Sequence, residues 1–334
     1  MKAIVVKDRW LRSIDEMVVD PNAPEPTLGK DQILVEIKAA ALNFFDILLV
    51  QGKYQDKPPF PFIPGAEFAG VILKVSPGAK TTLKPGDRVF GSGQGAFAER
   101  IVAQISNVIV IPEGMSFVEA AGLYITYPTS YAALVLRADL KKDEWCLVHG
   151  GAGGVGIAAV QIAKALGAKV IATGGSDEKL AIAAKYGADY VVNYKQNDWV
   201  NKIIKITSGR GVDVVYDPIG MVQESMKCIA WSGRLLVIGF AAGTIEKVAM
   251  NRVLLKNCSI LGLYWGSYSR YEKETIPRVW DGLLHLFRQG RVKPVVYHKV
   301  YYGLDSVRDG LKAVANRATY GKAIVVPNKG ESKI

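Results

Sequence analysis

The sequence predicts an α/β protein of two domains, one mostly β and discontinuous in the chain, the other built on a doubly wound parallel sheet. The chain of 334 residues is 49% hydrophobic and 22% charged, which is sufficient for two hydrophobic cores. Its first part consists of short strand-like runs separated by turn residues, whereas its middle part alternates apolar strand-like runs with helical patterns. Such alternation predicts parallel strands covered by helices on both faces.

The mostly β domain is expected over residues 1–121. Its strand-like runs lie at residues 33–37, 70–75 and 88–90, separated by Pro-Gly, Gly-Lys and Pro-rich turns. The parallel-sheet domain is expected over residues 122–266. Its predicted elements are strands at residues 145–149, 169–173, 191–194, 212–217 and 235–239 and helices at 155–166 and 178–186.

Residues 267–334 are expected to return to the first domain, because a doubly wound unit is already complete by residue 263. The pattern in this segment predicts a helix at 276–288, a strand at 295–300, a helix at 304–315 and a final strand at 322–326. The first domain is therefore predicted to be discontinuous.

Composition and charge narrow the class of protein. No apolar run is long enough to span a bilayer, and the first nine residues carry charges where a secretory signal is apolar, so we expect a soluble, cytoplasmic protein. Cys146, Cys228 and Cys258 lie in separate apolar runs and are expected to be buried free thiols. The net charge of +11 fits an anionic ligand, but the basic residues are scattered, so we expect no nucleic-acid partner.

The strongest local motif is Gly151-x-Gly153-x-x-Gly156, which follows the strand at 145–149 and opens the helix at 155–166. In this context the pattern is typical of a Rossmann dinucleotide site. The glycines permit a tight turn, and backbone N–H groups at Gly154 and Val155 can then approach a pyrophosphate. A glycine turn without a ligand is the structural alternative.

The end of the next strand favours NADPH over NADH. An NAD site places a carboxylate about 20 residues beyond the glycine motif, where it binds the ribose 2′-hydroxyl, but this chain has Gly174 there. The hydroxyl of Ser176 and the ammonium of Lys179 suit a 2′-phosphate as donor and countercharge. Asp177 and Glu178 oppose this assignment, although acids are also common in the first turn of a helix.

Three segments together resemble the quinone oxidoreductase branch of the medium-chain dehydrogenase/reductase superfamily, which includes ζ-crystallin, and within it the quinone oxidoreductase-like subgroup. They are residues 52–70 (GKYQDKPPFPFIPGAEFAG), 173–179 (TGGSDEK) and 261–266 (LGLYWG). The resemblance covers nearly the whole chain. It implies a GroES-like β domain, a Rossmann domain, an active site in the cleft between them, and a homodimer formed by edge pairing of Rossmann sheets near residues 259–264.

The resemblance also implies the residues that contact the cofactor. By position, Ser176, Lys179 and Tyr194 correspond to contacts of the 2′-phosphate. The residues that correspond to contacts along the rest of the dinucleotide are Thr129, Ile238, Gly239, Phe240, Leu263 and Arg317. A half-exposed strand end is the structural alternative for Tyr194, and a surface cation is the alternative for Arg317.

The metal ligands of zinc-dependent relatives are missing. Those relatives have a cysteine near the position of Asn43 and a histidine in a Pro-Gly-His-Glu stretch, which here reads Pro64-Gly65-Ala66-Glu67. The four-cysteine zinc lobe is also missing, and no histidine pairs with a cysteine at ligand spacing. Without a Lewis acid, we expect a substrate that accepts a hydride with little assistance, such as a quinone or an α,β-unsaturated carbonyl.

Asn43, Asp46 and Tyr54 match residues that face the nicotinamide pocket in the resembling family. Asn43 could hydrogen-bond the carboxamide or the substrate oxygen, and Tyr54 could donate to a developing enolate or phenolate. An Asn-mediated turn and a packed aromatic are the structural alternatives. Leu48 stands where bacterial relatives have a tyrosine, so we expect a more apolar pocket and a weaker case for quinones.

Three hypotheses of function follow. An NADPH:quinone reductase is the leading one, and an NADPH-dependent double-bond reductase acting on enones, enals or enoyl thioesters shares every cofactor residue with it. A non-catalytic NADPH-binding protein is the third, but the basic stripe with stacking aromatics that RNA binding needs is not visible. The terminal Ser332-Lys333-Ile334 resembles a peroxisomal address, which is the alternative to the cytoplasm.

Overall fold

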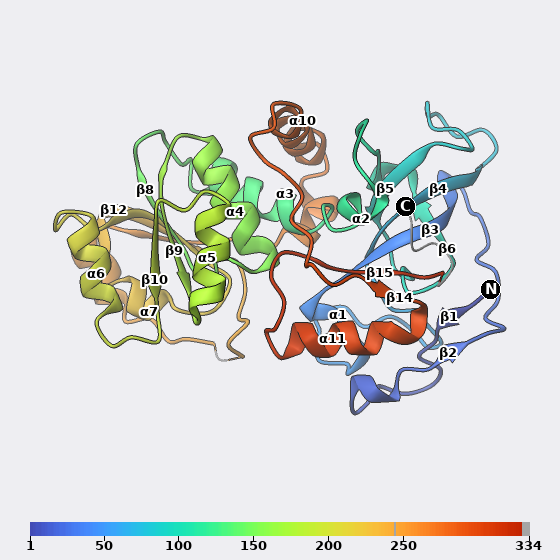
Figure 1. The fold of residues 1–334 in the computed structure, drawn as a ribbon. Helices are drawn as coiled ribbons and strands as arrows, with labels where there is room; N and C mark the ends of the chain where they lie inside the picture. Colours follow the sequence, from blue (N-terminus) through green and yellow to red (C-terminus); the bar gives the residue numbers. More distant parts are fainter. Residues whose placement is uncertain (244, 329–334) are drawn as a thin grey trace. The chain divides into compact units, whose positions relative to one another are not determined.

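A computed structural model describes residues 1–243 and 245–328, and the chain forms two compact units (Figure 1). The first joins Met1–Ile125 to the segment that starts at Pro294, and the second is Thr126–Lys293. One unit is mostly β and the other is a doubly wound parallel sheet, so the predicted α/β class is confirmed. The candidate peroxisomal tripeptide Ser332-Lys333-Ile334 lies outside the described residues.

The first unit is organised around a seven-stranded, largely antiparallel sheet in the order β14-β15-β3-β4-β5-β7, with β6 also paired to β3. Its strands are β1 (Ala3–Ile4), β2 (Val19–Asp20), β3 (Gln32–Leu42), β4 (Glu67–Val75), β5 (Arg88–Ser92), β6 (Arg100–Gln104), β7 (Val108–Val110), β14 (Tyr301–Tyr302) and β15 (Ala323–Val326). Its helices are α1 (Phe44–Val50), α2 (Phe117–Ala120) and α11 (Val307–Ala315), with short 3-10 turns at Ile14–Glu16, Ile105–Asn107 and Leu304–Ser306.

The central strand β3 positions the candidate site of this unit. Ile33, Val35 and Ile37 are fully buried and alternate with more exposed residues, as expected for a strand with one face against a core. The last four residues of the strand are all buried, where it pairs with β4 and β15. Because this buried end leads directly into Asn43 and α1, a polar side chain there has to find its partners inside the protein.

The strand predicted at residues 295–300 does not form. Val296 makes a single bridge to Lys322, and regular pairing resumes only at β14. Gly321 has a positive φ of 52° and lies so close to Val295 that an added Cβ would be 2.3 Å from the Val295 carbonyl oxygen. The chain therefore bends just before β15, and the ladder cannot continue along that segment.

The second unit contains a six-stranded sheet in the order β10-β9-β8-β11-β12-β13, in which all pairs are parallel. Its strands are β8 (Trp145–Val148), β9 (Lys169–Gly174), β10 (Tyr190–Asn193), β11 (Val212–Asp217), β12 (Ile229–Val237) and β13 (Ser259–Gly262). Counted from the first strand of the unit, this is the order 3-2-1-4-5-6 of Rossmann folds. The order reverses between β8 and β11, and ligands of such sheets bind at the carboxyl ends of the strands near that point.

Helices cover both faces of this sheet (Figure 1). They are α3 (Thr126–Tyr131), continued by a π-helical segment at Ala132–Arg137, α4 (Gly154–Ala165), α5 (Asp177–Lys185), α6 (Trp199–Ile206), α7 (Val222–Ser225), α8 (Met250–Lys256), α9 (Tyr268–Tyr271) and α10 (Thr275–Arg288), with a 3-10 turn at Trp265–Ser267. On the face covered by α6 and α7, Trp199 and Val222 pack in one buried cluster with Leu147 and Ile171 of the strands.

The boundaries of the units differ from the expected residues 121 and 267. Helix α10, expected in the returning segment, belongs to the second unit. The ring of Phe287 packs 5.4 Å from that of Tyr127, and Gly282 lies so close to Tyr131 that a Cβ would be 2.1 Å from its hydroxyl oxygen. These contacts hold α10 against α3, and the chain returns to the first unit only at Pro294.

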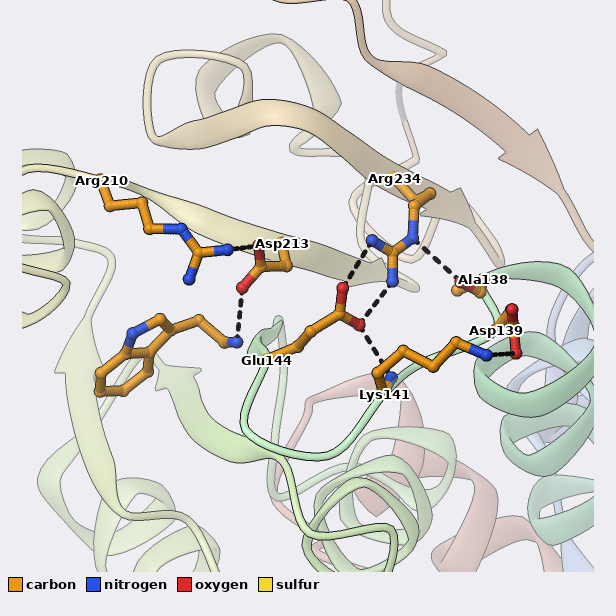
Figure 2. Close-up of polar contacts among 8 residues, drawn as sticks. Ala138, Asp139, Lys141, Glu144, Arg210, Asp213 and Arg234 are labelled. Carbon is orange, nitrogen blue, oxygen red and sulfur yellow. Dashed lines mark hydrogen bonds and ion pairs between the residues drawn. The ribbon is translucent and has the colours of Figure 1, made fainter.

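Ion pairs join the strands at the amino edge of the parallel sheet (Figure 2). Both terminal guanidinium nitrogens of Arg234 in β12 donate to Glu144, just before β8, at 2.9 and 2.6 Å. Asp213 in β11 accepts from the backbone N–H of Trp145 at 2.8 Å and from Arg210. These contacts connect the amino ends of β8, β11 and β12 to one another. The loops expected to bind a ligand lie at the opposite, carboxyl edge.

Two further expectations concern the cysteines and membrane-spanning segments. Cys146, Cys228 and Cys258 are buried and free, as predicted. Across residues 1–243 and 245–328, no helix is both long and apolar enough to cross a membrane.

Candidate functional site

The glycine-rich turn connects β8 to α4 at the carboxyl edge of the sheet. Gly153 is the N-cap of α4, and no side chain caps this helix. A Cβ on Gly156 would lie 2.1 Å from the carbonyl oxygen of Gly150, so only glycine allows the helix to start this close to the turn. Gly153 is exposed, and Gly154 and Val155 are partly buried. The turn therefore presents uncapped N–H groups of a helix N-terminus, which fits a pyrophosphate.

The other predicted dinucleotide contacts in this unit lie at the ends of neighbouring strands. Gly174 ends β9, Tyr194 follows β10, and Leu263 follows β13. Ile238, Gly239 and Phe240 follow β12, and Phe240 is 44% exposed. Because the strands are parallel, these residues share one edge of the sheet with the glycine turn. Thr129 lies in α3 and is partly buried.

The residues predicted to bind a 2′-phosphate cluster around Gly175. Ser176 is the N-cap of α5, and its hydroxyl accepts from the backbone N–H of Lys179 at 3.5 Å. A Cβ on Gly175 would lie 2.8 Å from the hydroxyl oxygen of Tyr194, so the tips of β9 and β10 meet at a residue without a side chain. The start of α5, the Ser176 hydroxyl and the residue Lys179 thus belong to this corner of the sheet, which we call the Gly175 corner, and these residue types suit a phosphate.

His149 is a buried residue of this edge to which no sequence motif assigns a role. It follows β8 directly, is 0% exposed, and burial lowers its pKa. Its Nδ1 is 2.9 Å from the hydroxyl of Thr173, and its Nε2 is 2.7 Å from the hydroxyl of Ser225. Because Ser225 donates its own proton to the carbonyl of Met221, Nε2 donates and Nδ1 accepts, as in a neutral imidazole.

Asp217 at the end of β11 holds the next loop of the edge. Its carboxylate is 1% exposed and accepts from the backbone N–H groups of Ile219, Gly220 and Met221 at 2.8, 3.0 and 2.5 Å. The acid therefore has a structural role at the centre of the sheet, next to the turn after β8.

A buried polar cluster lies in the first unit at the end of β3. Asn43, the N-cap of α1, donates from Nδ2 to Oε1 of Glu67 at 2.9 Å. Nζ of Lys322 donates to Oδ1 of Asn43 at 2.5 Å and also to Oε1 of Glu67. The second oxygen of Glu67 accepts from the backbone N–H of Ile125 at 3.1 Å. A fully buried carboxylate is thus neutralised by a buried ammonium, and Asn43 is hydrogen-bonded to both.

Asp46 lies one turn into α1, beside this cluster. Its Oδ2 accepts from the backbone N–H of Asn43 at 2.8 Å, and within the described residues its Oδ1 has no hydrogen-bond partner. Complete burial raises the pKa of Asp46 to about 7, against the opposing effects of the Asn43 N–H and the Lys322 charge. The cluster therefore holds one group that changes its charge near neutral pH.

Lys322 and the pairing role of Glu67 were missed by sequence reasoning. Lys322 precedes an apolar strand, where a lysine usually lies at the surface, yet it is 5% exposed. Gly122 makes room for it, because a Cβ there would lie 2.8 Å from Cβ and Cγ of Lys322. The one available signal was Glu67, an acid at the start of an apolar strand, which requires a partner when buried.

Two predicted residues belong to other segments of the first unit. Tyr54, in the loop after α1, is partly buried and stacks on Phe45 with ring centroids 5.2 Å apart. Arg317 is exposed just beyond α11 with a positive φ of 55°. Their assignment to substrate and cofactor remains a prediction. Across the described ranges, no group of three or more His, Cys, Asp or Glu side chains is arranged to hold a metal ion.

Comparison with known proteins agrees with both units. Residues 29–113 match the family model of the alcohol dehydrogenase GroES-like domain, and residues 154–281 match that described as zinc-binding dehydrogenase. A quinone oxidoreductase-like protein 2 homolog from Nematostella vectensis is 36% identical over 92% of this chain and 85% of its own length. Quinone oxidoreductase 1 of Escherichia coli is 33% identical over 90% of this chain and 92% of its own length.

A solved structure supports the same assignment. The Escherichia coli quinone oxidoreductase complexed with NADPH superposes with a TM-score of 0.87 at 29% identity, covering 98% of this chain and all of the other. Sequence and structural similarity thus extend over both units, including the GroES-like and Rossmann parts predicted above. The chain belongs to the quinone oxidoreductase branch of the medium-chain dehydrogenase/reductase superfamily.

Proposed function

We propose that this chain is an NADPH-dependent reductase that acts on quinones without a catalytic zinc. The observation that carries the proposal is the carboxyl edge of the parallel sheet, where the glycine turn, the uncapped start of α4 and the Gly175 corner lie at the ends of adjacent strands. NADPH bound there would supply the hydride, and the chain would supply binding and orientation. The NADPH complex of the Escherichia coli relative supports the same cofactor.

The first unit offers a specific hydrogen-bond donor to a substrate. Oδ1 of Asn43 already accepts from the ammonium of Lys322, and one Nδ2 hydrogen is donated to Glu67. The amide is thereby fixed in one orientation, and the group it could offer to a ligand is the second Nδ2 hydrogen. A donor of this kind stabilises an oxygen that gains negative charge, as in a quinone or enone that accepts a hydride.

The buried cluster also supports chemistry without a metal. Asn43 and Glu67, two side chains near the positions where zinc-dependent relatives have ligands, both bind the ammonium of Lys322. A second cation would be repelled by that charge and would have to displace it. The atoms that a metal would find here are Oδ1 of Asn43 and Oε1 of Glu67, both bonded to Lys322, whereas zinc prefers thiolate and imidazole ligands.

The test is NADPH oxidation measured with a panel of quinones, enones and enals in the presence of a metal chelator. We expect turnover with quinones that the chelator does not change. Turnover confined to enones or enals would favour the double-bond reductase, since the Asn43 amide could donate to the oxygen of an enone as well as to that of a quinone. Tight NADPH binding without turnover of any acceptor would favour a non-catalytic role, and loss of activity with the chelator would contradict the zinc-free mechanism.

We also propose a homodimer formed through β13. This strand is the edge of the parallel sheet, and Met250, Leu254 and Leu255 of α8 are 67%, 78% and 71% exposed. An unpaired edge with apolar side chains in the same unit favours pairing with a second copy. Analytical ultracentrifugation tests this, and a single monomeric species at micromolar concentration would contradict it.

A further inference from the structure

Lys195 lies beside the Gly175 corner and belongs to none of the sequence motifs described above. Strand β10 ends at Asn193, whose Oδ1 accepts from the backbone N–H of Lys195 at 3.0 Å and whose carbonyl accepts from Gln196 at 3.2 Å. The chain therefore turns immediately after the strand. In a continuing strand, consecutive side chains would point to opposite faces, but a turn allows two neighbours to reach the same place.

The close approach to Gly175 shows that this happens. A Cβ built on Gly175 would lie 2.8 Å from the hydroxyl oxygen of Tyr194 and 3.1 Å from Cε of Lys195. The side chains of Tyr194 and Lys195 thus converge on the glycine that precedes Ser176. Lys195 reaches this corner from the turn after β10, whereas Lys179 lies in the first turn of α5.

The ammonium of Lys195 is available for a ligand. Two other lysines of the same unit form ion pairs: Lys164 with Asp189 at 2.5 Å and Lys202 with Asp198 at 3.5 Å. Within the described part of the chain, Lys195 is exposed and forms no ion pair. An unpaired cation held over a glycine suits an anion more than it suits protein packing.

We propose that Lys195 is a second cationic contact of the NADPH 2′-phosphate and contributes to the preference for NADPH over NADH. The inference rests on the cofactor proposed above and adds a residue to it. A phosphate monoester carries a charge of about −1.5 to −2 at neutral pH, more than one lysine neutralises. Lys179 and Lys195 together match that charge, and the hydroxyls of Ser176 and Tyr194 are on the same corner.

The experiment is a calorimetric titration that needs no substrate. Wild type, Lys195→Ala and Lys195→Arg are titrated with NADPH, with NADH, and with the half-ligands adenosine 2′,5′-bisphosphate and 5′-AMP. Lys195→Ala should weaken NADPH and the bisphosphate about tenfold, the size of one solvent-exposed charge-assisted contact, and leave NADH and 5′-AMP within about twofold. Lys195→Arg should retain most of the affinity.

Lys205→Ala is the matched control. Lys205 is an exposed lysine of α6 in the same unit, so the substitution removes the same formal charge away from the Gly175 corner. An equal loss with Lys205→Ala would show a general charge effect and overturn the assignment of Lys195. Equal losses for NADPH and NADH in Lys195→Ala, or no loss, would overturn it while leaving NADPH binding intact. If wild type did not bind NADPH, the proposed cofactor itself would be wrong.

Discussion

Replacing Lys322 by methionine should destabilise the first unit by about 3 to 5 kcal/mol, the cost of removing one partner from a buried ion pair. The Lys322 and Glu67 side chains are 6% and 0% exposed. Methionine retains much of the apolar stem but leaves the Glu67 carboxylate buried without its counterion. The Asn43 amide and the Ile125 N–H remain as donors to it.

The assay is thermal unfolding of the purified variant. For a unit of roughly 150 to 250 residues, 1 kcal/mol corresponds to about 2 to 4 °C, so the melting temperature should fall by roughly 6 to 20 °C. The double variant Lys322→Met with Glu67→Gln removes both charges and should recover much of that loss. Lys312→Met is the control, since it breaks an ion pair with Asp15 in which both side chains are about half exposed.

Two results would refute this reasoning. One is a Lys322→Met protein that melts no lower than Lys312→Met, which would mean that Glu67 finds solvent or another donor. The other is a double variant no more stable than the single one, which would mean that the loss came from packing and not from an unpaired charge.

Two further predictions concern Asp46 and the glycine turn. Since burial raises the pKa of Asp46 from 3.8 to about 7, the folded chain holds a proton that the unfolded chain releases between these values, so stability falls as pH rises through this window. Asp46→Asn should remove that slope: urea unfolding should show a gain over wild type that grows from pH 4 to pH 7, and a constant difference would contradict the assignment. Gly156→Ala places a Cβ 2.1 Å from the Gly150 carbonyl oxygen and should weaken NADPH more than tenfold in the same calorimetric titration, as loss of a positioned phosphate contact implies. Gly93→Ala, in the first unit, where a Cβ would come no nearer than 3.4 Å to another atom, is its control, and equal NADPH affinity in both variants would show that the turn tolerates a side chain.

The parallel-sheet unit could be predicted because its signals are local. The predicted strand at residues 212–217 coincides with β11, and the glycine motif spans the turn after β8 and the first residues of α4, as expected. Each strand is a short apolar run bounded by turn residues, and the helices show apolar residues at intervals of about three to four positions. Such patterns need only about ten consecutive residues, so they are readable without knowledge of tertiary contacts.

The buried cluster could not be predicted, because its members are distant in sequence. Lys322 and Asn43 are separated by 279 residues, and no local pattern links them. Read alone, Lys322 is a cation at the start of a strand, Glu67 an acid without metal partners and Asn43 a helix cap. The absence of the strand expected at residues 295–300 also depends on residues distant in sequence. The chain bends at Gly321, beside Val295, and no pattern within residues 295–300 shows that bend.

The carboxyl edge of the parallel sheet is organised by the chain's own groups before any ligand is considered. His149 connects the ends of β8 and β9 to α7 through Thr173 and Ser225, and Asp217 holds the loop after β11 through three backbone N–H groups. These groups are buried, so their hydrogen bonds do not exchange readily with water. A ligand that binds at this edge therefore spends little free energy on ordering the loops. We therefore expect recognition of a phosphate at this edge to depend on the uncapped start of α4 and on exposed residues of the Gly175 corner, such as Ser176 and Lys195.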